Sequence, residues 1–339
     1  MKGKVWAWLR LTGGATILGL LAWRLGTNAF LDGMRVIDVR VLLLAVGIGL
    51  LTTVCSAWRW CLVARGMGLA LPLAGAVADY YRAIFLNAAL PGGVLGDVHR
   101  AVRHGREVAD VGRGVRAVVL ERTAGQLVLF AVAAGVLLTL PVPASARLVT
   151  AAQVTVAMVA AAALVVAMFV AVRRRRPQVR RADAAGSGRS WWTRAVGRTV
   201  ADLRNGLLAR RTWPGVALLS VAALAGHLAT FLVAARAAGS TAPLHQLAPL
   251  MVLALLAMAV PLNVGGWGPR EGVTAWAFGA AGLGAGLGLT VAVVYGLLAL
   301  TASLPGAGVL AARWLRRLPA ARQRPPLRLR LRLRPRPAT

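Results

Sequence analysis

Carboxylate side chains are scarce in this chain. Aspartate and glutamate number 10 among 339 residues, against 40 lysines and arginines, which leaves a formal net charge of +30. In a soluble protein this imbalance would indicate nucleic-acid binding. Here 58% of the residues are hydrophobic, and the positive charges fall between long apolar blocks, as the positive-inside rule describes for membrane proteins. We therefore expect a membrane protein with no nucleic-acid partner.

Cysteine and metal-binding patterns are equally sparse. The two cysteines, Cys55 and Cys61, lie in or beside an apolar block, so we expect inert thiols rather than a disulfide framework. The four histidines show no metal-ligand spacing, and no HExxH, paired CxxC, GxSxG or P-loop motif occurs. We therefore predict no metal, no other cofactor and no catalytic residue, and we expect that the protein is not an enzyme.

Apolar blocks long enough to cross a bilayer, which takes about 20 residues, recur along the chain. They predict an all-α polytopic bundle with six full spans. The expected spans are Leu11–Leu31, Val41–Trp58, Ala117–Leu140, Leu148–Val172, Trp213–Ala235 and Leu287–Leu310. Residues 1–315 would form this transmembrane domain, with a basic connector at 172–212 inside it. The arginine-rich tail at 316–339 is either disordered or in contact with anionic headgroups.

Connections rich in arginine alternate with connections that carry little charge. The rich ones hold five, twelve and ten arginines, at 98–116, at 173–211 and from 313 onward; the poor ones are 32–40, 141–147 and 236–246. Because basic loops stay in the cytoplasm, both termini should be cytoplasmic, and we expect the cell membrane as the location.

Two apolar segments do not fit this alternation as single crossings. Leu73–Asp97 must enter and leave from the cytoplasm, and Leu247–Gly286 from the outside. We predict two re-entrant or broken hairpins, although eight or more shallow crossings would also fit. Irregular backbone at membrane depth is tolerated only when it is buried in protein or lines a wet cavity, so the hairpins imply an internal cavity.

The two hairpins break at similar motifs, each with a proline, a glycine pair, a further glycine, and then an acid and an arginine. The first has Pro91, Gly92, Gly93, Gly96, Asp97 and Arg100; the second has Pro261, Gly265, Gly266, Gly268, Arg270 and Glu271. Paired broken helices of opposite orientation indicate an inverted repeat with a site between its halves. The alternative is a pair of ordinary loops between helices.

The charged residues beside these breaks favour a binding site. Backbone N–H groups at the start of a helix after a break can hold an anion such as a lipid phosphate, and ionisable groups at membrane depth tend to be functional. Glu121 and Arg122 lie one turn inside a span, and adjacent helix residues do not face each other. We expect each to have a partner elsewhere, with Arg270 or Glu271 as candidates, or Arg122 to reach the interface.

Taken together, these motifs resemble the lysylphosphatidylglycerol synthase transmembrane (flippase-like) family over most of the chain. The positions that carry the resemblance are Asn87, Leu90, Pro91, Gly92, Gly93, Gly96, Asp97 and Arg100, then Glu121, Arg122 and Gly125, then Pro261, Gly265, Gly266, Gly268, Arg270 and Glu271. The departures are Leu95 for a glycine, Glu121 for an aspartate, and Trp267 for a small or apolar residue. These departures concern substrate specificity more than the fold.

The resemblance implies a membrane protein that binds or translocates an anionic, aminoacylated or glycosylated lipid. In fused relatives a separate soluble domain performs the aminoacyl transfer, and we expect this chain not to make lysylphosphatidylglycerol by itself. We assign phosphate contacts to Arg100 and Arg270, because arginine can bind phosphate through two groups. Asp97, Glu121 and Glu271 would orient the arginines or bind a cationic headgroup.

Two other functions stay open. The first is a membrane glycosyltransferase, or a component of a polyprenyl-phosphate sugar pathway, with Asp97 or Glu271 as a base. The second is a scaffold in which the charges only hold helices together. The lipid, the direction of transport, the energy source and the oligomeric state are not specified by the sequence.

Overall fold

The structure is a computed structural model that describes residues 33–89, 94–139, 201–259 and 268–322. Its helices are α3 (Val39–Gly66), α4 (Leu73–Ala89), α5 (Leu95–Glu107), α6 (Val111–Thr139), α10 (Trp213–Ala237), α11 (Leu244–Ala259), α12 (Pro269–Ala280), α13 (Ala285–Ser303) and α14 (Pro305–Arg322). The described residues contain no strand. Four helical stretches are long and apolar enough to cross a membrane: Val39–Gly66, Val111–Val136, Trp213–Ala237 and Ala285–Leu315. The prediction of an all-α polytopic membrane protein is confirmed.

Four of the six predicted apolar blocks fall on helices that the structure describes. The second, third and fifth expected spans correspond to α3, α6 and α10. The last block is divided by a turn at Leu304 into α13 and α14, because proline has no N–H to donate and begins the second helix at Pro305. The expected spans Leu11–Leu31 and Leu148–Val172, the two breaks themselves and the end of the tail lie outside the described residues, so re-entry at the breaks stays a prediction.

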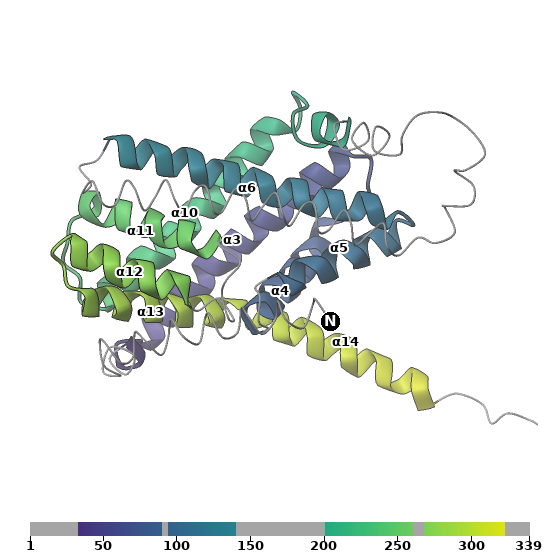
Figure 1. The fold of residues 1–339 in the computed structure, drawn as a ribbon. Coiled ribbons are helices and arrows are strands. Elements are labelled where there is room, and N and C mark those ends of the chain that lie inside the picture. Colours follow the sequence, from purple (N-terminus) through teal and green to yellow (C-terminus); the bar gives the residue numbers. More distant parts are fainter. Residues whose placement is uncertain (1–32, 90–93, 140–200, 260–267, 323–339) are drawn as a thin grey trace, which may run out of the picture.

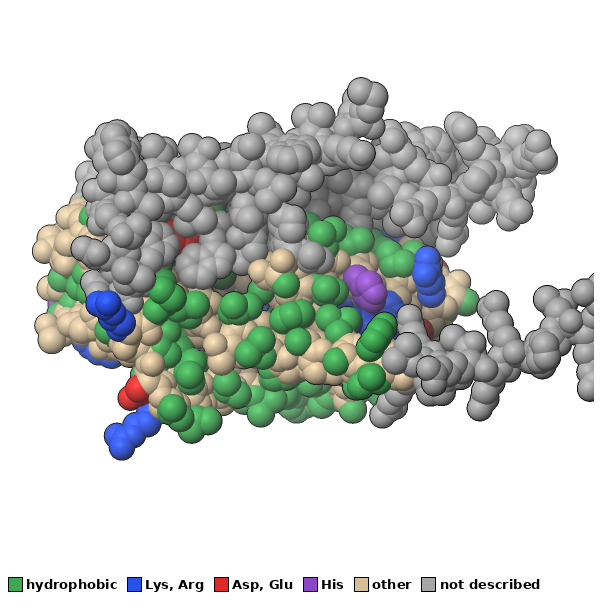
Figure 2. Space-filling model, turned by 90° about the horizontal axis from the view of Figure 1, so that it is seen from below, with side chains coloured by type: hydrophobic (Ala, Val, Ile, Leu, Met, Phe, Trp, Pro, Cys, Tyr) green, Lys and Arg blue, Asp and Glu red, His purple; other side chains and the backbone are tan. Residues whose placement is uncertain are grey.

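The outer surface suits a bilayer. Large apolar side chains remain exposed on α3 and α10, among them Leu43, Leu51, Trp58 and Leu218. Figure 2 shows hydrophobic side chains over the middle of one face, with arginines mostly toward its ends. In water such a surface would mark an interaction site, whereas in a membrane it faces lipid.

The described helices form two halves with the same element order: α3, α4, α5 and α6, then α10, α11, α12 and α13. In each half the second helix packs on the first and the third packs on the fourth. Across the halves α6 packs on α10 and α11, whereas α13 packs on α3 and α4, and α3 packs directly on α10. The α4–α5 and α11–α12 pairs approach the centre from opposite sides (Figure 1). This arrangement agrees with the predicted inverted repeat.

Glycines allow the closest helix approaches. A Cβ added to Gly96 of α5 would lie 2.0 Å from the carbonyl oxygen of Ala83 in α4. A Cβ on Gly226 of α10 would lie 2.0 Å from Oγ1 of Thr52 in α3. The Gly96 contact brings α5 against α4, and the Gly226 contact brings the two halves together at α3 and α10. The site lies between these two halves.

Candidate functional site

A cavity of about 400 Å³ lies where the two halves meet. Its wall includes Asn87 and Ala88 at the end of α4, Met258 and Ala259 at the end of α11, and Arg270 at the start of α12. Both hairpins therefore bring the residues beside their breaks to one space. The sequence placed a binding site between the halves, and this cavity occupies that position.

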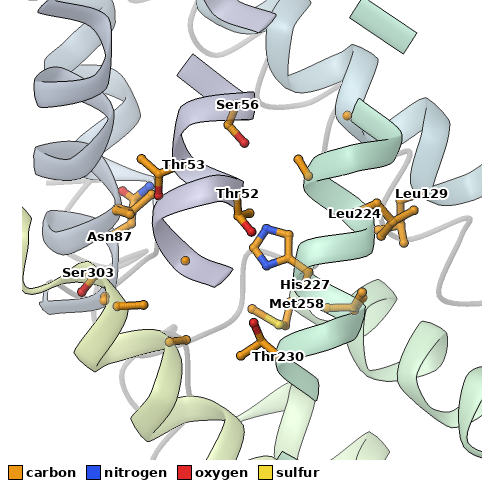
Figure 3. Close-up of a pocket in the computed structure, with 18 of the residues that line it drawn as sticks. Thr52, Thr53, Ser56, Asn87, Leu129, Leu224, His227, Thr230, Met258 and Ser303 are labelled. Carbon is orange, nitrogen blue, oxygen red and sulfur yellow. The ribbon is translucent and has the colours of Figure 1, made fainter. Parts of the chain in front are cut away.

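The cavity has polar and apolar walls. Figure 3 shows Thr52 of α3 and His227 of α10 pointing toward one another, with Thr230 nearby. Leu129 and Leu224 supply apolar surface. These walls suit a ligand that has a polar part beside an apolar part.

Glu121 of α6 is the centre of a buried ion network. Its carboxylate accepts hydrogen bonds from Arg59 Nε at 3.0 Å, from Arg100 Nη2 at 2.7 Å and from the Tyr80 hydroxyl at 3.2 Å. Its side chain and that of Arg100 are fully buried. Arg59 also donates to Ser220 Oγ at 3.1 Å, which links the network to α10. Buried charges require such partners, because an unpaired charge in the interior is costly.

Asp97, in the first turn of α5, extends the network toward the first break. Its carboxylate accepts from Arg100 Nη2 at 2.9 Å and from Arg122 Nη2 at 2.6 Å. Asn87 Nδ2 donates to the same carboxylate at 3.0 Å, while Asn87 Oδ1 accepts from the Gly96 N–H at 2.7 Å. Hydrogen bonds therefore join the end of α4, before residues 90–93 in the chain, to the start of α5, after them.

Two aromatic rings enclose the guanidinium of Arg100. Its Cζ lies 4.6 Å from the centroid of Trp60 and 4.3 Å from that of Tyr80. Such cation–π contacts favour a charged group that has left water. Arg100 is therefore fixed behind the cavity wall and does not line the cavity.

The second half carries a smaller charged site. Glu271 accepts from Arg270 Nε at 2.9 Å and from the backbone N–H of Gly268 at 2.6 Å. Gly268 has a φ of +121°, a conformation that glycine adopts and L side chains rarely do. The Arg270 guanidinium lies 5.1 Å from the Tyr295 ring, and the Tyr295 hydroxyl is 3.4 Å from His227 Nδ1. The start of α12 thus presents a fixed guanidinium to the cavity.

The structure brings together most of the predicted site residues that it describes. Asn87, Arg122 and Arg270 line the cavity. Asp97, Glu121 and Glu271 do not line it but form ion pairs with the arginines that do. Gly96 and Gly268 shape the two hairpins. Pro91, Gly92, Gly93, Gly265 and Gly266 lie outside the described residues.

The expected partners of Glu121 and Arg122 require a correction. Neither pairs with Arg270 or Glu271: Glu121 pairs with Arg59 and Arg100, and Arg122 pairs with Asp97. The helix register sends Glu121 toward α3 and α5, within its own half of the bundle. Arg270 and Glu271 instead pair with each other.

Arg59 is the main charged residue that sequence reasoning missed. The expected second span ended at Trp58, whereas α3 continues to Gly66, so Arg59 lies inside the helix and is 6% exposed. An arginine inside so long an apolar helix was the available signal. Gln126, Ser220 and Tyr295 also line the cavity, and nothing in their local sequence distinguishes them.

The described residues contain no group of three or more histidine, cysteine, aspartate or glutamate side chains placed to hold a metal. The charged groups on the described cavity wall are the guanidiniums of Arg59, Arg122 and Arg270. Guanidinium groups bind phosphate and carboxylate well. The arrangement is therefore chemically suited to an anion.

The profile of the lysylphosphatidylglycerol synthase transmembrane region matches residues 7–334. The chain belongs to this family. Membership makes it a membrane protein connected with lipid handling, in agreement with the apolar helices and the cationic cavity. No protein of curated function and no solved structure shows significant similarity to it.

Proposed function

We propose that the protein binds the phosphate of a membrane lipid in the central cavity and carries that lipid between leaflets, without performing a chemical reaction on it. The observation that supports this most directly is the origin of the three cavity arginines: Arg59 comes from α3, Arg122 from α6 and Arg270 from α12. They converge from both halves of the bundle. In this proposal both termini face the cytoplasm at the cell membrane, as the arginine distribution predicts.

Position on the cavity wall separates the arginines by role. Arg59, Arg122 and Arg270 line the cavity, with 7%, 41% and 3% of their side chains accessible, whereas Arg100 is fully buried and does not line it. We assign phosphate contact to Arg59, Arg122 and Arg270, and give Arg100 the task of holding Asp97 and Glu121. Each contacting arginine has a carboxylate on its far side, which keeps the guanidinium in place while no lipid is bound.

Translocation also requires access from both leaflets. The α4–α5 hairpin reaches the cavity from one side and the α11–α12 hairpin from the other (Figure 1). Inverted repeats of this kind support alternating access, in which the halves rock about a fixed central site. The hairpins would then be the parts that open in turn.

A scrambling assay tests the proposal. The full chain is reconstituted into liposomes with a fluorescent phosphatidylglycerol, and loss of fluorescence after addition of a membrane-impermeant reductant reports exchange between leaflets. We expect exchange with the wild-type protein and its loss in Arg122→Gln and Arg270→Gln. A hydrogen bond to a charged group contributes about 1.5–3 kcal/mol. Loss of one such bond should therefore weaken the affinity for the lipid roughly 10- to 150-fold.

The matched control is Arg103→Gln. Arg103 is a partly exposed arginine of α5 that pairs with Asp79 and Glu107 and does not line the cavity. This variant should exchange lipid like the wild type. Wild-type activity in the Arg122 and Arg270 variants, with all proteins equally inserted, would refute the assignment.

A further inference from the structure

The carboxylates that the structure describes all have partners inside the chain. The described residues include eight acids: Asp38, Asp79, Asp97, Glu107, Asp110, Glu121, Asp202 and Glu271. Asp38 and Asp110 accept backbone N–H groups at helix starts, and the other six pair with arginines. None of the eight lines the cavity. The segments 90–93 and 260–267, between the paired helices, contain no acidic residue in the sequence.

The buried ion network of the first half has a net positive charge. In the first half, the guanidiniums of Arg59, Arg100 and Arg122 are shared between the carboxylates of Asp97 and Glu121. One positive charge is left over. Arg270 and Glu271 balance each other. The described site is therefore complementary to a single negative charge, which is the charge of a phosphate diester.

The neutral polar groups of the wall are mainly acceptors. The hydroxyls of Thr52, Ser220 and Thr230 donate to carbonyl oxygens of their own helices, at Ile48, Val216 and Gly226 respectively. Their oxygens then offer only lone pairs to a ligand. Gln126 lines the cavity, and its Oε1 is buried and has no hydrogen-bond partner. A buried acceptor of this kind is complementary to a donor on the ligand.

We propose that the cavity selects a lipid whose headgroup is a phosphate diester bearing uncharged hydroxyl groups, and that it discriminates against headgroups with an ammonium group. The diester would meet Arg59, Arg122 and Arg270, and hydroxyl groups would donate to Gln126 and the threonine oxygens. An ammonium would meet three guanidiniums on the described wall and no carboxylate there. This inference rests on the proposed lipid-binding function, and it excludes aminoacylated lipids as preferred ligands.

Competition binding to the purified full chain tests the selectivity. A fluorescent phosphatidylglycerol is displaced by unlabelled phosphatidylglycerol, by lysylphosphatidylglycerol, by phosphatidylethanolamine or by a glycosyl polyprenyl phosphodiester. We expect the two ammonium-free lipids to compete at least about tenfold better, since charge complementarity governs discrimination at such a site. The comparison between those two distinguishes a glycerol headgroup from a sugar.

Gln126→Glu provides a second test, because it adds one carboxylate to the wall with almost no change in shape. We expect phosphatidylglycerol binding to fall by about tenfold and the ratio of lysylphosphatidylglycerol to phosphatidylglycerol binding to rise. Gln246→Glu is the control, since it makes the same change at an exposed position at the start of α11 outside the cavity. It should leave both affinities unchanged.

The outcomes separate the two proposals. If no lipid displaces the probe and the probe itself does not bind, the proposed function fails. If lysylphosphatidylglycerol competes as well as phosphatidylglycerol, lipid binding stands and the inferred selectivity is overturned. The wild-type comparison decides the selectivity even if the Gln126 variant does not fold.

Discussion

The two halves share an order of helices but hold their charges in different ways. In the first half, Glu121 of α6 binds Arg59 of α3 and Arg100 of α5, which are 62 and 21 residues away in the chain. In the second half, Glu271 binds its neighbour Arg270 and the N–H of Gly268, three residues away. The first charged site therefore forms only when its helices assemble. The hydrogen bonds of the second are made within one helix start.

This difference indicates that the charged residues of the first half support the fold, whereas those of the second half mainly serve binding. The first network joins the four helices of its half, reaches α10 through Ser220 and encloses Arg100 between aromatic rings, so its loss should affect the fold as well as the binding of lipid. The Arg270–Glu271 pair presents one guanidinium from a capped helix start, so its loss should affect binding more than the fold. Measurements of stability and of lipid binding on matched variants can separate these effects.

Glu121→Gln should have the largest effect on stability. The substitution leaves two buried guanidiniums without this carboxylate, and breaking a buried ion pair costs about 3–5 kcal/mol. We expect a clearly lower midpoint of thermal unfolding in detergent. The midpoint is measured by size-exclusion chromatography of the protein that remains folded after heating.

Glu107→Gln is the control for that experiment, because Glu107 pairs with Arg103 at an exposed position. Exposed pairs contribute about 0–1 kcal/mol, so this variant should unfold near the wild-type midpoint. Equal midpoints for the two variants would show that the network does not support the fold.

Gly96→Ala should have an intermediate effect, confined to the first hairpin. Its new Cβ would lie 2.0 Å from a backbone oxygen of α4, so α5 would have to move, and overpacking of this kind costs about 1–3 kcal/mol. Gly47→Ala in α3 is the control, because a Cβ there meets nothing within 4 Å. That change should be neutral or slightly stabilising, since alanine favours the helix. If both variants unfold at the same temperature, the close approach of α4 and α5 does not contribute to stability.

The sequence predicted the fold better than the connections within the site. Runs of apolar residues located α3, α6 and α10 because a bilayer demands about 20 such residues, and the proline–glycine motifs correctly separated α4 from α5 and α11 from α12. The partners of Glu121 depend on how α3 and α5 are turned about their axes, which no local pattern specifies. Arg100 illustrates the limit: its position beside the first break was predicted, but helix register turns it away from the cavity toward Trp60 and Tyr80.

Glu271→Gln should have the smallest effect on stability of the three. The glutamine oxygen can still accept from Gly268, and Arg270 keeps its contact with the Tyr295 ring and its place on the cavity wall, so we expect a loss of about 1–2 kcal/mol, in the range of a weakened helix cap. Lipid binding should fall much more, because Arg270 loses the carboxylate that holds it in place. Thermal unfolding and displacement of fluorescent phosphatidylglycerol on the same preparation measure both effects. A loss of stability as large as that of Glu121→Gln would mean that the second half also depends on its charged pair for folding, and the contrast between the halves would be lost.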